Sequence, residues 1–322
     1  MHLLDHIRHH SLAGENILHV VAVVSNPVRY QSRYRLARQF VESVQKAPCV
    51  RLHLVEACFG DRLPEVADSS NPDHLIVRTE SEIWIKENMI NLGMRRVLVN
   101  HPEARYLAWV DADVEFRDLS WAQETIHALQ HFPLVQPWSD CLDLNFAGGV
   151  TKHFKSFGAQ HQRRAPKQMS PDQPYEYAHS GFAWACTRGF WEASGGLMDF
   201  AILGSADHHM AFAAIGEVKN TIHGGMCEAF KRRCHQWQDR ALRSTLGEVG
   251  FTAGRIEHQF HGPKRRRYYR ERWQILVDHG FDPDRHLTYD HQGVLQLVGK
   301  PALEQAIRQY NRSRYEDSIE EF

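Results

Sequence analysis

Residues 106–116 read Tyr-Leu-Ala-Trp-Val-Asp-Ala-Asp-Val-Glu-Phe, an apolar and aromatic run that ends in the carboxylates of Asp111 and Asp113. A short apolar run between polar residues predicts a buried parallel strand. Ligands of open α/β sheets bind in the crevice outside the carboxyl ends of the strands. Carboxylate oxygens at this end suit Mg²⁺ or Mn²⁺, which in turn hold a diphosphate. The alternative is a solvated acidic turn. The chain has a second Asp-x-Asp triplet, Asp282-Pro283-Asp284, which we interpret as such a turn.

The sequence on both sides alternates short apolar runs with amphipathic stretches, the pattern of βαβ units. It predicts an α/β fold in a single domain, because no shift in composition marks a boundary. The expected strands cover residues 17–25, 50–56, 75–78, 106–110 and 133–137. The expected helices cover residues 29–46, 83–99, 121–130, 206–214, 265–279 and 302–310. Residues 140–170 are rich in Gly, Gln and basic side chains and predict a long mobile loop.

The composition is that of an ordinary globular protein. Of 322 residues, 43% are hydrophobic and 24% charged, and the formal net charge is -1, so affinity for a polyanion must come from local patches. The first residues lack the apolar segment of a secretory signal, and no run approaches the ~18 apolar residues of a membrane span. We therefore expect a cytoplasmic protein whose six cysteines, none in CxxC spacing, are reduced.

Three other segments carry polar side chains in suggestive positions. Asn88 and Asn91 fall on one face of the expected helix before the Asp111 strand and could support the site, although surface amides are the alternative. Asp207 stands at an expected helix start, where the helix dipole alone also favours a carboxylate. His261 precedes Gly262, and it competes as a metal ligand with His208 and its neighbour.

The order of these segments resembles that of GT-A nucleotide-sugar glycosyltransferases, galactosyltransferases in particular. The resemblance runs from about residue 18 to residue 290. It rests on a strand ending in Asn26-Pro27, a strand ending in Glu56, the helix segment Lys86-Glu-Asn-Met-Ile-Asn-Leu-Gly93 and Asp111-Ala-Asp113. Further on come Ser180-Gly-Phe-Ala-Trp184, Gly195-Gly196-Leu197, Gly204-Ser-Ala-Asp207-His208 and His258-Gln-Phe-His261-Gly262.

The resemblance implies roles for individual residues. Asp111 would lie near the ribose and the metal ion, Asp113 and His261 would bind Mn²⁺ or Mg²⁺, and Asp207 would be the base of an inverting reaction. The companion glutamate of that last segment is missing here, since Gly204-Ser205-Ala206 precedes Asp207. The donor side would comprise Asn26, Pro27, Glu56, Asn88, Asp111 and Asp113. The acceptor side would comprise Trp138, Gly181, Trp184 and His208, where the aromatic rings could equally belong to the core.

The implied organisation is an N-terminal extension (1–16), a nucleotide-sugar half (17–138), an acceptor half (139–290) and a helical tail (291–322). The implied reaction transfers a sugar, by family default from a UDP-sugar, to a hydroxyl group. Two rival interpretations remain: a nucleotide-binding protein on a degenerate scaffold, and a nucleotidyltransferase. The second usually needs a glycine-rich phosphate loop after the first strand, whereas the turn here, Ser25-Asn-Pro-Val-Arg29, has no glycine.

Two basic clusters bear on the acceptor. Residues 151–175 hold five basic side chains against one acid, and residues 255–272 hold seven against two, with aromatic residues interleaved. Such interleaving is how proteins hold single strands or flipped bases. We therefore expect an anionic acceptor, either a phosphorylated glycan or nucleic acid with a hydroxylated base; the alternatives are a neutral sugar, a protein side chain, or charge that only grips the donor diphosphate.

Overall fold

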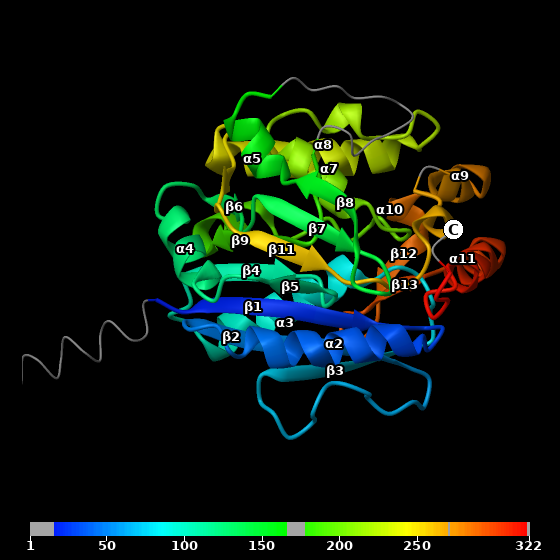
Figure 1. Cartoon of the computed structure of the whole chain (residues 1–322). Helices are drawn as coiled ribbons and strands as arrows, with labels where there is room; N and C mark the ends of the chain where they lie inside the picture. Colours follow the sequence, from blue (N-terminus) through cyan, green and yellow to red (C-terminus); the bar gives the residue numbers. More distant parts are fainter. Residues whose placement is uncertain (1–15, 166–177, 270, 321–322) are drawn as a thin grey trace, which may run out of the picture.

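The computed structural model describes residues 16–165, 178–269 and 271–320. A mixed sheet of seven strands in the order β10-β6-β9-β4-β1-β2-β3 forms its centre (Figure 1). The strands are β1 (Leu18–Ser25), β2 (Val50–Phe59), β3 (His74–Thr79), β4 (Tyr106–Val110), β6 (Leu134–Gln136), β9 (Ala183–Thr187) and β10 (Gly250–Phe251). This confirms the predicted α/β class and the five strands expected in the first half.

The strand directions bring several carboxyl ends to one edge. β1 runs parallel to β2 and to β4, with Leu18 opposite Val50 and Tyr106. β9 runs antiparallel between β4 and β6, which makes the sheet mixed rather than purely parallel. Asn26 after β1 and Asp111 after β4 therefore lie at the same edge of the sheet, as the sequence predicted.

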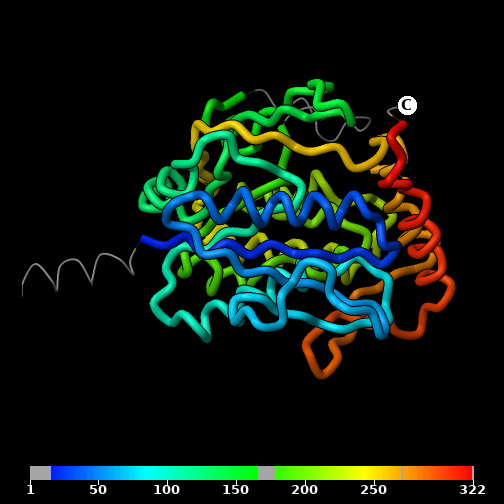
Figure 2. Tube along the Cα trace, turned by 60° about the horizontal axis from the view of Figure 1, so that its bottom comes forward, coloured from blue at the N-terminus to red at the C-terminus, as the bar shows by residue number. Residues whose placement is uncertain are grey.

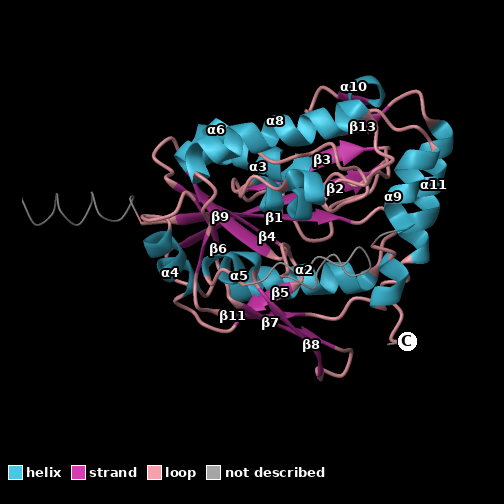
Figure 3. Ribbon diagram, turned by 90° about the horizontal axis from the view of Figure 1, so that it is seen from above, coloured by secondary structure: helices cyan, strands magenta, loops and turns pink. Residues whose placement is uncertain are grey.

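Helices cover both faces of the sheet (Figure 3). One face carries α3 (Lys86–Asn100), α6 (Arg188–Ser194), α7 (Ala206–Ala213) and α8 (Glu228–Thr245). The other carries α2 (Gln31–Val44) and α4 (Trp121–Ala128). Gly93 lets α3 approach the sheet closely, because a Cβ there would lie 2.8 Å from side-chain atoms of Val21 and Val55.

A second sheet of four strands, β5-β11-β7-β8, packs beyond α2 and α4. Its strands are β5 (Val114–Phe116), β7 (Asp140–Leu144), β8 (Val150–Lys155) and β11 (Arg255–His258). The expected long loop at 140–170 is thus wrong over most of its length, because β7 and β8 form a hairpin and α5 (Phe157–Gln162) follows. Residues 166–177 lie outside the described residues.

The C-terminal elements gather at the carboxyl edge of the central sheet (Figures 1 and 2). They are the 3₁₀ turn Lys264–Arg267, α9 (Glu271–Asp278), α10 (Pro283–His286), the hairpin β12 (Leu287–Tyr289) and β13 (Leu295–Leu297), and α11 (Pro301–Ser313). The single helix expected at 265–279 is therefore divided, and Tyr268, with φ of 43°, separates its two parts. Within the described ranges, no helix is both long and apolar enough to cross a bilayer.

Candidate active site

A cavity of about 190 Å³ opens at the carboxyl edge of the sheet. Segments from the whole length of the chain line it, from Asn26 and Pro27 after β1 to the stretch that follows α11. Its charged lining consists of five acidic and five basic side chains: Glu87, Asp111, Asp113, Asp207 and Glu316, with Arg33, Lys86, Arg267, Arg272 and Arg314. The site is therefore strongly polar but close to electrically balanced.

One carboxylate and two imidazoles converge on a wall of this cavity. Oδ2 of Asp113 lies 3.0 Å from Nε2 of His261, and Oδ1 of Asp113 lies 3.9 Å from Nε2 of His258. The two Nε2 atoms are 3.3 Å apart. All three side chains thus offer a ligand atom within 4.8 Å of the others. Asp113 and His261 were predicted as the metal pair, whereas no sequence pattern favoured His258 as a ligand.

Asp143 fixes the orientation of His258. Nδ1 of His258 and Oδ1 of Asp143 form a buried hydrogen bond of 2.8 Å, which leaves Nε2 facing Asp113. The other oxygen of Asp143 accepts from Lys264 and, at 3.1 Å, from Thr151. Burial lowers the pKa of His258 to about 4, and the bond to Asp143 opposes this shift only in part. At neutral pH His258 is therefore an uncharged imidazole, the form that binds a metal.

The donor set fits a divalent cation. Burial would raise the pKa of Asp113, but the contact with His261 outweighs this effect, so the carboxylate is ionised. Its Oδ1 is buried without a hydrogen bond from any described residue. A buried carboxylate oxygen is costly without a partner, and a cation held with the two imidazoles would supply one. Arg267 also reaches this place, with Nη2 2.9 Å from Nε2 of His261.

Asp111 belongs to a different group of charges. Its backbone N–H donates to Phe182 O at 2.7 Å, which ties the end of β4 to the segment before β9. Its carboxylate forms an ion pair with Lys86. Burial raises the pKa of the neighbouring Glu87 to about 7; Lys86 opposes this shift, while Asp207 and Asp111 add to it. Trp84 donates a hydrogen bond of 3.1 Å to Glu87.

Asp207 stands in the first turn of α7, at the edge of the cavity. The backbone at Gly181 lies close to the Asp207 carboxylate, since a Cβ on Gly181 would lie 2.7 Å from Oδ2 of Asp207. The two residues before α7, Gly204 and Ser205, both have positive φ, 86° and 72°. Arg272 donates a hydrogen bond to the hydroxyl of Ser205. This turn therefore holds the start of the helix, and with it Asp207, against the cavity.

The stretch after α11 closes one side of the site. Glu316 is only 2% exposed and pairs with Arg33 and Arg314. Although burial acts to raise the pKa of Glu316, these two guanidinium groups hold it well below its usual range. Gly262 makes room for this stretch, because a Cβ there would lie 2.6 Å from Cα of Glu316. Residues 291–322 were expected to be a tail, but Asn311, Arg314 and Glu316 of this stretch line the cavity.

Several predicted site residues lie away from the cavity lining. Glu56 accepts three backbone N–H bonds, at 2.6–2.9 Å, from the loop of residues 65–67. Asn88 bonds to the β12–β13 hairpin through Gly293 O and Leu295 N. Trp138, Trp184 and His208 are buried in the core. These contacts are those of residues that hold the scaffold, and the cavity takes Asn26, Pro27, Asp111, Asp113, Gly181, Asp207 and His261 from the predicted set.

Much of the basic charge that suggested an anionic acceptor is paired. Lys155 bonds to Asp140, Arg164 to Glu248 and Lys264 to Asp143. Of the second cluster, Arg267 and Arg272 line the cavity beside Tyr269. Lys167 lies outside the described residues. Several cavity-lining residues had no predicted role in the site, because contacts with neighbours distant in sequence place them there: Arg33, Lys86, Glu87, His258, Arg267, Arg272, Arg314 and Glu316. Asp143, behind His258, also had none.

Comparison with known proteins shows similarity at the level of structure. No family model and no curated protein sequence matches the chain. The structure is similar to S. aureus TarS 1-349 in complex with UDP-GlcNAc, with a TM-score of 0.42, 8% identity, and 77% of this chain and 60% of that chain covered. TarS 1-349 without that ligand gives a TM-score of 0.41, 8% identity, and 81% and 64% coverage.

A second similar protein is the catalytic domain of Drosophila β1,4-galactosyltransferase 7 in complex with xylobiose. The TM-score is 0.38 at 10% identity, and 91% of this chain and 98% of that chain are covered. By name that protein is a galactosyltransferase. The chain spans less than two thirds of the length of the TarS chains. At these TM-scores the likeness lies in the general course of the chain, and an activity must be argued from the side chains of the cavity.

Proposed function

We propose that the chain is a metal-dependent glycosyltransferase that moves a sugar from a nucleoside-diphosphate sugar, by preference a UDP-sugar, to a hydroxyl group. One observation carries the proposal: the Asp113, His258 and His261 ligand atoms and the carboxylate of Asp207 line the same cavity at the carboxyl edge of the sheet. A bound metal ion can neutralise the leaving diphosphate, and a separate carboxylate can deprotonate the acceptor hydroxyl.

The metal side would carry the donor diphosphate. Asp113, His258 and His261 would hold Mn²⁺ or Mg²⁺, which supplies a Lewis acid for the charge that develops on the leaving diphosphate. Arg267 and Lys86 add positive charge to the same cavity. Asn26 turns the chain after β1 by accepting from Tyr30 N at 3.0 Å and donating to Tyr30 O at 2.8 Å. This turn would form the floor under the nucleotide.

The second carboxylate would act on the acceptor. Asp207 would accept the proton of the acceptor hydroxyl as its oxygen attacks the anomeric carbon opposite the leaving nucleoside diphosphate, and such a single displacement would invert the anomeric configuration. General-base assistance of this kind contributes typically ~10²–10⁴-fold. Glu87, with its pKa of about 7, lies in the same charge group and can take or give a proton at neutral pH. For the acceptor, the Arg272 guanidinium lies over the Tyr269 ring at 5.2 Å on the cavity wall, and its positive charge would suit a glycan that carries negative charge.

The test is a screen of UDP-sugars with and without Mn²⁺. Binding is read by thermal shift, and a ligand present at 100 times its Kd adds ~2.7 kcal/mol of stability. Slow hydrolysis of a donor, in the absence of acceptor, is read from released free sugar. UDP-GlcNAc and UDP-galactose should both be included in the panel.

Each rival function gives a distinct result. Release of pyrophosphate from a nucleoside triphosphate would identify a nucleotidyltransferase. Metal-dependent UDP binding without hydrolysis or transfer would identify a binding protein on this scaffold. Absence of metal-stimulated binding across nucleoside diphosphates and their sugars would overturn the proposal.

A further inference from the structure

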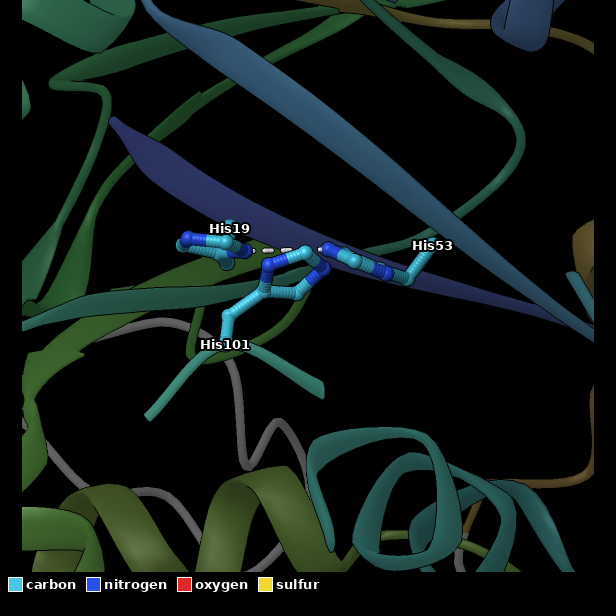
Figure 4. A group of neighbouring side chains, drawn as sticks. All are labelled: His19, His53 and His101. Carbon is cyan, nitrogen blue, oxygen red and sulfur yellow. Dashed lines mark hydrogen bonds between the residues drawn. The ribbon is translucent and has the colours of Figure 1, made fainter. Parts of the chain in front are cut away.

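Three histidines meet at the opposite edge of the central sheet (Figure 4). His19 is the second residue of β1, His53 lies on β2, and His101 follows the last residue of α3. Seven residues of extended chain from His19 to Asn26 span about 23 Å. The cluster is therefore separate from the cavity, and no step of the proposed reaction uses it.

The geometry of the fold brings these rings together. His19 pairs in register with Arg51 and Val21 with His53, so the two imidazoles are diagonal neighbours on one face of the sheet. α3 covers that face, and its end delivers His101. The ring centroids lie 5.3 Å (His19 to His53), 4.9 Å (His19 to His101) and 5.5 Å (His53 to His101) apart.

The nitrogen atoms face one another rather than solvent. His19 and His53 are each 4% exposed. Nδ1 of His19 lies 3.0 Å from Nε2 of His53, and each of the three rings offers a nitrogen within 4.8 Å of the others. In a tetrahedral zinc site with bonds of about 2.0–2.1 Å, the ligand nitrogens lie about 3.3 Å apart. Small movements of the three side chains would therefore bring their nitrogens to the separation that a zinc ion needs.

Asp73 adds a carboxylate to the three rings. Its Oδ1 lies 3.5 Å from Nδ1 of His53 and 3.6 Å from Nε2 of His101. Its Oδ2 accepts from Arg51 at 2.9 Å, which holds it in place. A carboxylate behind the outer nitrogen of a histidine is the usual device that orients a metal-binding imidazole. Nε2 of His101 is buried and makes no hydrogen bond to a described residue.

We propose that His19, His53 and His101 bind one divalent transition-metal ion, with Zn²⁺ as the best match, and that Asp73 orients His53 or supplies the fourth ligand. Imidazole nitrogen is a preferred ligand of Zn²⁺. The ion ties the beginnings of β1 and β2 to the end of α3, so its role is structural. Simple packing does not explain the cluster, because apolar side chains would fill this face without leaving polar nitrogens buried. Burial lowers the pKa of His19 to about 4 and of His53 to about 3, which keeps both rings in the neutral, ligating form.

The test uses the full chain, stripped with a chelator and titrated with Zn²⁺ and then with Co²⁺. The first ten residues contain His2, His6, His9 and His10, so the titration is done in a background where these four are replaced by Gln. We expect two equivalents of Zn²⁺, one at the Asp113 site and one at the three histidines, and the second should raise the Tm. Binding of Co²⁺ at the same site should give visible d–d absorption.

Single variants His19→Gln, His53→Gln and His101→Gln should each weaken Zn²⁺ binding at least tenfold. Asp73→Asn should weaken it about 10–100-fold, as changes to a ligand-orienting carboxylate do. The matched control is the double variant His127→Gln with His131→Gln. These two exposed rings are neighbours, His127 on α4 and His131 just after it, and their loss should leave the Zn²⁺ affinity unchanged. Donor hydrolysis should survive in the cluster variants, whereas Asp113→Asn should remove a different equivalent of metal, so the two sites are judged independently.

Two results would overturn the proposal. One is a Zn²⁺ equivalent that is lost on replacing the first four histidines and is insensitive to His53→Gln. The other needs no variant: crystals of the unaltered protein soaked in Zn²⁺ should give an anomalous peak between the three rings, and its absence would exclude the site even if the variants misfold.

Discussion

His261 Nε2 lies 3.0 Å from Asp113 Oδ2, a contact that joins the turn between β4 and β5 to the segment that follows β11. Nε2 of His258 lies 3.3 Å from Nε2 of His261, and Nδ1 of His258 forms a hydrogen bond of 2.8 Å with Oδ1 of Asp143. These four residues come from three separate stretches of sequence, since His258 and His261 lie in the same segment. Their convergence supports the divalent-cation site that we propose for the donor diphosphate.

Asp113→Asn should abolish Mn²⁺-stimulated binding of UDP. The change removes the carboxylate charge but keeps the shape, and the loss should exceed the ~10–100-fold that follows from disturbing a residue that only orients a ligand. Calorimetric titration of UDP with and without Mn²⁺ measures it. Glu115→Gln is the control, because Glu115 lies nearby on β5 with a side chain 43% exposed. An Asn variant that keeps its Mn²⁺ dependence would remove Asp113 from the metal site.

Asp143→Asn should lower the Mn²⁺ affinity about 10–100-fold, although Asp143 is not among the proposed ligands. The amide would loosen the hold on Nδ1 of His258 and weaken the bond to Lys264. The same titration measures the effect. Asp140→Asn provides the control on the same strand, since Asp140 bonds to His153 at 2.8 Å and to Lys155. Equal effects of the two variants would show that the strand as a whole, rather than His258, is disturbed.

Asp207→Asn should bind donor normally and lose transfer. A general base acts mainly in the transition state, so kcat should fall by ~10²–10⁴-fold while KM changes little. Thermal unfolding and UDP titration establish that the variant is folded and binds. A near-normal kcat in that variant would mean that another group takes the proton, with Glu87 the first candidate.

Gly181→Ala should reduce kcat through Asp207. The added Cβ would lie 2.7 Å from Oδ2 of Asp207 and 2.9 Å from Cε1 of His179, so one of these side chains must move. Gly189→Ala is the matched control, because a Cβ there meets nothing within 4 Å. Alanine in place of glycine in a helix should raise the free energy of unfolding by roughly 0.5–1 kcal/mol and leave kcat unchanged. In the Asp207→Asn background, Gly181→Ala should lower kcat little further, since both changes act on the same carboxylate. Full additivity would contradict this link.

The sequence predicted those parts of the site that depend on local pattern. The run 106–110 is a strand with the expected bounds, and Asp111, Asp113 and Asp207 all reach the cavity. An apolar strand that ends in carboxylates and a glycine-containing turn before a helix can be identified within about ten residues. The five strands expected in the first half were confirmed for the same reason.

The remaining site residues depend on long-range contacts that no local pattern records. Glu316 belongs to a stretch that packs directly against Gly262, where a side chain would collide with its backbone. Asp143 lies on a hairpin whose polar sequence predicted a loop. Glu56 and Asn88 have the polarity of site residues, but their hydrogen bonds hold a loop and a hairpin. His19 and His53 look like ordinary alternating strand residues until the register of β1 and β2 is known.

The stability of the protein should depend on pH through Glu87. Burial raises the pKa of this group from 4.5 to about 7. Between these two values the native state binds more protons than the unfolded state, so the free energy of unfolding falls as the pH rises. Above about pH 7 the full penalty is present, and it is absent below pH 4.5. This direction is opposite to that of a carboxylate stabilised by an ion pair, because burial dominates here.

Glu87→Gln removes this dependence. The free energy of unfolding of the variant, relative to the native sequence, should rise between pH 5 and pH 8 by at most about 3 kcal/mol, as 1.36 kcal/mol per pKa unit implies. Urea unfolding at four pH values, without added metal, measures it. Glu87→Leu is the companion variant: it also lacks the charge but leaves Trp84 Nε1 without its acceptor, so it should follow the same pH trend with a constant loss of about 1–3 kcal/mol. A difference between Glu87→Gln and the native sequence that stays constant from pH 5 to pH 8 would show that Glu87 does not titrate in this window, and it would withdraw Glu87 as a group that exchanges protons in the site.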